Sequence, residues 1–250
     1  MSADTRTQRP AAGNEWTVFP EWAPELLKAR VYGRILLDII LGDLAPGSRL
    51  DEQDLVSRYD AGLAGVRDAL GRLALEGLVV RRARAGTSVA PLDLLEVRQA
   101  VEARRLIEPY CAALAAMNAG PEDIARLRAA FDGAEVAVRA NDAVALVRMD
   151  QSFHEAIAQA SRNVTLARIL IPLQHKAARF WVYSMGVDTE ARRLEEIAQH
   201  LEVVDRIAAR DAEGASAAVL RTLGAFTDDA NRAVNGPPEA MARAARGRNG

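Results

Sequence analysis

The chain has 250 residues, enough for two domains that each bury a core. Half of the residues are hydrophobic, which excludes a disordered chain, and the formal net charge of −2 excludes nucleic-acid binding through overall basicity. The single cysteine, Cys111, excludes an internal disulfide and suits a reducing compartment. The N-terminal residues lack the apolar core of a signal peptide, and no uncharged run is long enough to cross a membrane, so we expect a cytoplasmic protein without a membrane partner.

The N-terminal part of the chain is predicted to hold a disordered segment followed by an amphipathic helix. Residues 1–23 contain Gly, Pro, Asn and Thr without periodicity, and we expect Trp16, Phe19 and Trp22 to anchor this segment on the first domain. Within residues 24–41, apolar side chains recur every three or four positions, which predicts a helix with one buried face.

Residues 51–76 are predicted to form two helices joined by a tight turn. Asp51 is a favourable N-cap for the first helix. On a helical wheel of the second, apolar residues gather on one side, and Arg67 and Arg72 flank the opposite, outward side. Gly77 ends this second helix, because glycine adopts the left-handed conformation of a helix C-terminus at little cost.

A two-stranded wing is predicted next, from the β-branched pair Val79-Val80, a turn at residues 83–86 and an extended segment at residues 87–89. The basic residues near its tip are Arg81, Arg82 and Arg84. Residues 24–91 contain ten Lys or Arg against nine Asp or Glu, so positive charge matters only where it collects, on the second helix of the pair and on the wing. Helix, turn, helix and basic wing together predict a DNA-binding domain over residues 24–91.

The pattern after Pro91 changes to long helical periods without strand signals. The predicted helices are 92–117, 121–140, 142–161, 164–185, 189–209 and 211–234. We expect them to pack as an antiparallel bundle of six or seven helices over residues 92–234, followed by a disordered tail at residues 235–250. The predicted fold is therefore mostly α: a winged helix-turn-helix of three helices and a β-hairpin, then a helical bundle.

Several motifs in residues 27–91 agree in order and spacing with one bacterial regulator family. They include Leu44-Ala45-Pro46-Gly47-Ser48-Arg49-Leu50, Val66-Arg67-Asp68-Ala69-Leu70-Gly71-Arg72-Leu73, Glu76-Gly77-Leu78-Val79 and Gly86-Thr87-Ser88-Val89. This part of the chain resembles the winged helix-turn-helix of the GntR family. The resemblance implies that Arg58, Arg67, Arg72, Gly86 and Thr87 lie where the family meets DNA, and we expect a homodimer on a double-stranded DNA operator.

One departure from the GntR pattern lies at the start of the second helix of the helix-turn-helix pair. The family usually carries Ser-Arg-Thr-Pro there, whereas this chain has Gly62-Leu63-Ala64-Gly65. A missing hydroxyl cap costs about 1 kcal/mol of helix stability, and a lost bidentate arginine contact to guanine costs about 1 to 3 kcal/mol of discrimination. We therefore expect weaker or differently specified DNA binding, and the alternative is a sensing module whose DNA binding has decayed.

Asp150, His154 and His200 form a candidate metal site. Asp150 and His154 stand four residues apart on one predicted helix, so they project from the same face, and a bundle can bring His200 opposite them. One carboxylate and two imidazoles suit a divalent ion such as Zn, Ni, Mn or Fe. From spacing alone, the alternative is a surface pair or a hydrogen-bonded core histidine.

The bundle resembles the FadR-type C-terminal ligand-binding domain, the FCD domain, over residues 92–231. The resemblance rests on Glu102-Ala103-Arg104-Arg105-Leu106-Ile107-Glu108-Pro109, Asp150-Gln151-Ser152-Phe153-His154, Asn163, His200 and Asp211-Ala212-Glu213-Gly214-Ala215. It implies a metal held by one Asp and three His, of which Asp150, His154 and His200 match. Thr222 falls at the expected fourth position, so we expect weaker metal binding, and His175 matches no ligand position and is expected to be a packing or pocket-wall residue.

The same resemblance implies a small organic acid as effector, with Arg104, Trp181 and Tyr183 as candidate residues of its cavity. The expected function is therefore a ligand-responsive transcription regulator that is not an enzyme. A different function remains open from the residues alone, because two histidines and one carboxylate are also the metal ligands of non-haem iron oxygenases.

Overall fold

The computed structural model describes residues 26–84, 86–184 and 189–235. The N-terminal elements are α1 (Leu27–Leu41), β1 (Arg49–Leu50), α2 (Glu52–Tyr59), α3 (Leu63–Leu75), β2 (Val79–Arg82) and β3 (Gly86–Val89). The expected anchor at Trp16, Phe19 and Trp22 and the tail beyond Asn235 lie outside the described residues. No helix in the described part of the chain is both long and apolar enough to cross a membrane.

The ends of α2 and α3 follow from the residues that cap them. The Asp51 side chain accepts hydrogen bonds from the backbone N–H groups of Gln53 and Asp54, at 2.8 and 3.3 Å, which confirms the predicted N-cap. Gly62 precedes α3 and makes no side-chain cap, as its missing hydroxyl predicts. Gly77 has a φ of +77° and follows the end of α3 as expected.

The prediction of a two-stranded wing was incomplete, because the sheet has three antiparallel strands in the order β1-β3-β2. Val80 and Ser88 are partners across the predicted hairpin, and Ser88 also pairs with Arg49 of β1. β1 is only two residues long and its partner strand lies far along the chain, so local periodicity carries no signal for it.

The second domain holds the helices α4 (Leu94–Asn118), α5 (Pro121–Ala129), α6 (Ala134–Arg139), α7 (Ala143–Ala160), α8 (Val164–Ser184), α9 (Glu190–Ala208) and α10 (Ala212–Asn235). One predicted helix, 121–140, is two helices, because Gly133 takes a left-handed φ of +78° between α5 and α6. These seven helices lie side by side as a bundle, and α4 contacts α7, α8, α9 and α10.

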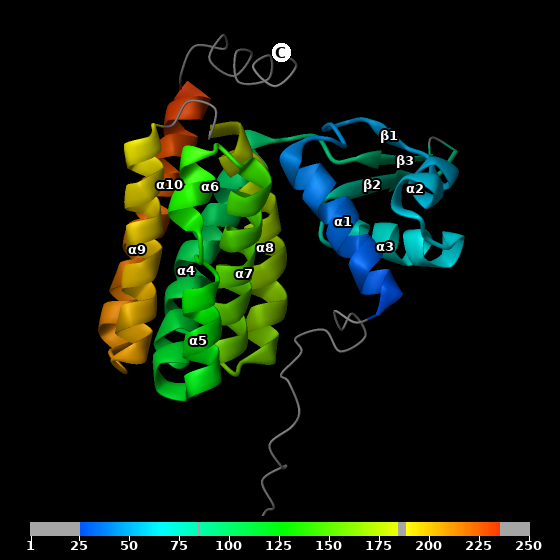
Figure 1. Cartoon of the computed structure of the whole chain (residues 1–250). Helices are drawn as coiled ribbons and strands as arrows, with labels where there is room; N and C mark the ends of the chain where they lie inside the picture. The colour runs from blue at the N-terminus through cyan, green and yellow to red at the C-terminus, as the bar shows by residue number, and fades with distance from the viewer. Residues whose placement is uncertain (1–25, 85, 185–188, 236–250) are drawn as a thin grey trace, which may run out of the picture.

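The two domains share a hydrophobic core. One cluster of buried residues joins Ile35 and Ile39 of α1 to Ala178 and Val182 of α8 and Leu146 of α7. Figure 1 shows α1 and α3 beside the face of the bundle that α8 forms. The position of the N-terminal domain is therefore fixed by apolar contacts with the helices of the bundle.

We expect Gly33→Ala to raise the free energy of unfolding by about 0.5 to 1 kcal/mol, because Ala is the better helix former. Gly33 is exposed in the middle of α1, and an added Cβ would meet no atom within 4 Å. Urea denaturation of the full chain measures the change. Gly77→Ala is the contrasting variant: at φ +77° its Cβ would lie 2.9 Å from Lys176 Nζ, so it should lose about 1 to 2 kcal/mol. A change of stability in the same direction in both variants would contradict the helical conformation of Gly33 or the left-handed conformation of Gly77.

Candidate DNA interface and metal site

The exposed surface of α2 and α3 carries two of the predicted DNA-binding arginines. The Arg67 side chain is 59% exposed and pairs with Glu52 at 2.7 Å. The Arg58 side chain is 45% exposed and pairs with Asp38 at 2.5 Å. Exposed ion pairs of this kind contribute little stability, so both guanidinium groups can exchange a carboxylate for a phosphate at small cost.

The wing extends this basic surface. Arg81 donates from Nη2 to the backbone oxygen of Arg67 at 3.1 Å, which connects β2 to α3. Gly86 pairs with Arg82 across the hairpin and has a φ of +88°, and the next residue of β3, Thr87, is half-buried. The exposed arginines of the sheet are Arg49, Arg81 and Arg82, and Arg84 is exposed in the turn between β2 and β3. Sequence reasoning missed Arg49, because β1, the strand that carries it, was not predicted.

The structure contradicts the expected place of Arg72 on the outward side of its helix. Its side chain is only 12% exposed and donates from Nε to Glu76 at 2.9 Å. Its guanidinium carbon also lies 4.2 Å from the centre of the Tyr32 ring of α1. A helical wheel separates polar from apolar faces, but it does not show that a polar flank meets another helix of the fold. We therefore leave Arg72 out of the candidate DNA interface.

Arg72 belongs to a buried polar group between the domains, which we call the interdomain cluster: Tyr32, Arg72, Glu76 and His175. The Tyr32 hydroxyl donates to both Glu76 carboxylate oxygens, at 2.9 and 2.8 Å. His175 of α8 places Nδ1 3.1 Å from Glu76 Oε2. Burial raises the pKa of Glu76, but His175, Arg72 and Tyr32 outweigh burial and hold that pKa below its usual value. Glu76 is therefore an anion that joins the end of α3 to the bundle.

The bundle brings together the three predicted metal ligands. Asp150 and His154 of α7 and His200 of α9 each offer one ligand atom, and these atoms lie within 4.8 Å of one another. His200 Nδ1 donates to the backbone oxygen of Glu196 at 2.7 Å, which leaves Nε2 as the nitrogen that can bind an ion. Burial and the nearby His154 lower the pKa of His200 to about 4, so its imidazole is neutral, the form that a metal binds.

A buried glutamate orients the second histidine. His154 pairs through Nδ1 with Glu108, which is fully buried, and its Nε2 lies 3.2 Å from Asp150 Oδ1. Burial lowers the pKa of His154, but Glu108 and Asp150 outweigh burial and raise that pKa to about 9, so an ion that binds Nε2 must displace a proton. A carboxylate that holds the second nitrogen of a histidine ligand is a common support of metal sites. Glu108 belongs to the motif at residues 102–109 on which the FCD resemblance rests, but that motif does not predict its contact with His154.

Arg104, Trp181 and Thr222 line the same partly open cavity as the three predicted ligands. Arg104 is buried and donates from Nε to Glu108 at 2.9 Å. The Thr222 hydroxyl donates to the backbone oxygen of Val219 at 2.8 Å. The side chain of Tyr183 lies outside the described residues. The donor set of one carboxylate and two imidazoles in a buried polar cavity fits a divalent ion, with Thr222 where a fourth ligand is expected.

A winged helix-turn-helix with exposed arginines, packed on a helical bundle, is the architecture of a DNA-binding regulator with a second, helical domain. Residues 27–89 match the family model of the bacterial regulatory proteins of the gntR family, and residues 93–225 match the FCD domain. This chain belongs to the GntR family of transcriptional regulators and carries an FCD domain.

The relatives agree with this family. BphR of Paraburkholderia xenovorans, an uncharacterized HTH-type transcriptional regulator, is 30% identical over 73% of this chain and 76% of its own length. LutR of Bacillus subtilis is 28% identical over 73% of this chain and 91% of its own. The putative L-lactate dehydrogenase operon regulatory protein of Escherichia coli is 29% identical over 80% and 84%. Proteins of this kind are transcriptional regulators and generally not enzymes, so the oxygenase alternative gains no support.

Solved structures share the fold. The structure of E. coli McbR/YncC covers 84% of this chain and 99% of its own, with a TM-score of 0.73 and 21% identity. A GntR regulator from Rhodococcus sp. RHA1 covers 82% and 98%, with a TM-score of 0.64 and 23% identity.

Proposed function

We propose that this protein is a cytoplasmic, homodimeric regulator that binds a double-stranded DNA operator and responds to a small organic acid held in the bundle. The observation that carries this proposal is a pair of consecutive residues on α8. Gln174 donates from Nε2 to the metal-site residue Asp150 at 2.5 Å, and His175 contacts Glu76 at the end of α3.

Consecutive residues of a helix point about 100° apart, so one turn of α8 faces both the cavity and the DNA-binding domain. Gln174 and His175 are both buried, so a shift of α8 cannot leave either contact unchanged. Ligand binding that favours one position of α8 therefore changes the position of α3. This supplies the differential contacts that a ligand needs in order to shift a regulator between two states.

The cavity suits a carboxylate. Arg104 presents a guanidinium, which pairs with carboxylates in a planar geometry. A divalent ion, when bound by Asp150, His154 and His200, supplies open coordination positions for a carboxylate oxygen. The candidate ions are Zn, Ni, Mn and Fe, since imidazole and carboxylate ligands suit all four. The E. coli relative named for an L-lactate dehydrogenase operon supports an acid as effector, because lactate is a small organic acid.

A gel-shift assay against DNA from upstream of the gene, at moderate salt, tests operator binding. We expect Arg67→Ala to weaken specific binding about tenfold, because a good arginine contact to a base edge is worth about 1 to 3 kcal/mol. Arg128→Ala is the matched control, since Arg128 is equally exposed but pairs with Asp205 within the bundle. Equal effects of the two variants would contradict the assignment of Arg67 to the DNA interface.

The same assay distinguishes a protein that binds its operator specifically from one that has lost sequence-specific DNA binding. Gly62→Ser combined with Leu63→Arg restores the cap and the arginine that the family usually has at the start of α3. An added Cβ at Gly62 meets no atom within 4 Å, so the first change fits without strain. Sequence-specific binding by the unmodified chain supports the proposal, whereas specific binding only after restoration would show that DNA reading has decayed.

A further inference from the structure

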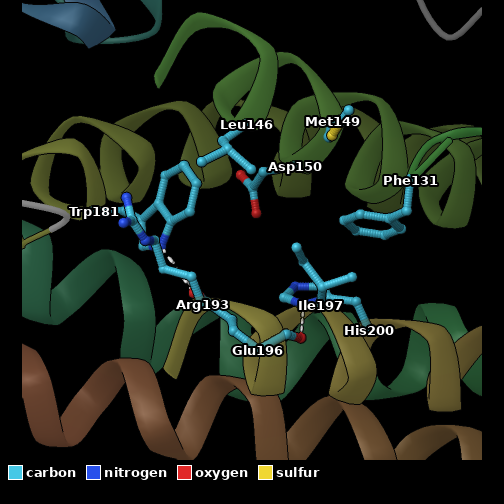
Figure 2. Close-up of a pocket in the computed structure, with 9 residues that line it drawn as sticks. All are labelled: Phe131, Leu146, Met149, Asp150, Trp181, Arg193, Glu196, Ile197 and His200. Atoms are coloured by element: carbon cyan, nitrogen blue, oxygen red, sulfur yellow. Dashed lines mark hydrogen bonds between the residues drawn. The ribbon is translucent and has the colours of Figure 1, made fainter. Parts of the chain in front are cut away.

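A second cavity adjoins the metal site and has a different character. It is a small, partly open space between α7 and α9 and shares Asp150, Trp181, Glu196 and His200 with the polar cavity. Its apolar lining residues are Phe131, Leu146, Met149, Trp181 and Ile197. Figure 2 shows the rings of Trp181 and Phe131 at opposite ends, with Asp150 between them facing His200 and Ile197. We call this space the apolar lobe.

Two polar groups of the apolar lobe are already engaged. Trp181 donates from Nε1 to the Glu196 carboxylate at 3.1 and 3.3 Å. Arg193 donates from Nη1 to Asn141 at 2.5 Å, whereas its buried Nε has no hydrogen-bond partner among the described residues. The Asp150 and Glu196 carboxylates line both cavities, whereas most of the other side chains around the lobe are apolar. The lobe is therefore suited to hydrocarbon rather than to charge.

The apolar lobe also adjoins the core that the two domains share. Leu146 belongs to the hydrophobic cluster that contains Ile35 and Ile39 of α1, and Met149, Trp181 and Ile197 pack against that cluster. A group that fills the lobe therefore touches side chains whose packing holds the DNA-binding domain. Of these side chains only Trp181 also lines the polar cavity, so an acid of two or three carbons held there leaves Leu146, Met149 and Ile197 untouched.

We propose that the effector is a monocarboxylic acid with an apolar tail, an aryl or branched alkyl group. Its carboxylate lies in the polar cavity, at Arg104 and the Asp150, His154 and His200 site, and its tail occupies the apolar lobe. This inference rests on the proposed response to an organic acid and adds the part of the ligand that carries specificity. Covering these apolar side chains with hydrocarbon strengthens binding in proportion to the apolar area removed from water.

Isothermal titration of the full chain with phenylacetate, acetate and succinate, with and without added Zn²⁺, tests the inference. We expect phenylacetate to bind at least about tenfold more tightly than acetate and succinate. Ile197→Thr and Met149→Gln should each reduce that preference about threefold or more while acetate binding stays the same. Ile169→Thr, at an exposed position outside the cavity, is the control and should change nothing. Thermal melts of each variant confirm that it is folded.

The results distinguish the proposed response to an organic acid from the proposed apolar tail of that acid. Equal binding of acetate and phenylacetate, or tighter binding of succinate, overturns the apolar tail and leaves the acid response standing. A preference for phenylacetate that survives both lobe variants also overturns it, because the tail then lies elsewhere. Binding of none of the three acids under either condition removes the acid response and the tail together.

Discussion

Replacing Thr222 with histidine should tighten Zn²⁺ binding by the bundle about tenfold or more, because a fourth ligand, an imidazole nitrogen, replaces a weakly coordinating hydroxyl. Thr222 lines the same cavity as Asp150, His154 and His200, so a larger ligating side chain there is near the ion. The Thr222 hydroxyl already donates its hydrogen to Val219, so the substitution removes only one local hydrogen bond. His200→Ala should have the opposite effect and abolish tight binding, since it removes one of three ligands.

Competition with a chromophoric chelator, on protein purified without chelator or affinity tag, measures both changes. Thr222→Ser is the control, because it keeps a hydroxyl and should leave affinity within about twofold. Glu108→Gln should lower affinity about 10- to 100-fold, since supporting residues of metal sites have effects of that size. Unchanged affinity in both Thr222→His and His200→Ala would show that the three residues do not hold the ion.

The second large effect is expected at the interdomain cluster. Glu76→Gln should lower the free energy of unfolding by about 3 kcal/mol, because Arg72 and His175 lose the buried anion that pairs with them. It should also abolish the effect of the bound acid on DNA affinity, because α8 and α3 then lack their charged connection. Glu135→Gln is the matched control, since Glu135 pairs with Arg139 on the exposed surface and contributes at most about 1 kcal/mol.

Three measurements check this prediction: urea denaturation, acid binding, and operator binding with and without the acid. A variant that binds both acid and DNA but no longer couples them supports the cluster as the connection between the domains. A double-mutant cycle with His175→Gln measures how much of the coupling passes through this one contact. Full retention of the acid response in Glu76→Gln would falsify the role of the cluster, whatever happens to stability.

The pH dependence of stability provides a further readout for the same variant. The pKa of Glu76 is lower in the folded protein than its ordinary value, so the folded state binds the proton less tightly than the unfolded state does. The stabilisation is therefore complete above the unfolded pKa, near 4.5, and is lost as pH falls through the folded pKa. The acid limb of the stability curve should flatten in Glu76→Gln, because glutamine does not titrate.

The sequence by itself determined what depends on neighbours along the chain. The Asp51 cap, the absence of a cap at Gly62 and the end of α3 at Gly77 follow from single residues and their backbone preferences. The placement of Asp150 and His154 on one face follows from their four-residue spacing on a helix. The spacing of the residues allowed His200 to lie near Asp150 and His154, and the resemblance to the FCD pattern assigned His200 to the same metal site.

Only the tertiary structure decided which polar residues meet across the fold. It turned Arg72 inward toward Tyr32, paired β1 with β3, and placed Glu108 behind His154. It also put Gln174 and His175 against the two sites that they join. These partners lie 24 or more residues apart in the chain, so their contacts depend on how helices pack. Periodicity assigns a residue to a face of its own helix, whereas packing decides what that face touches.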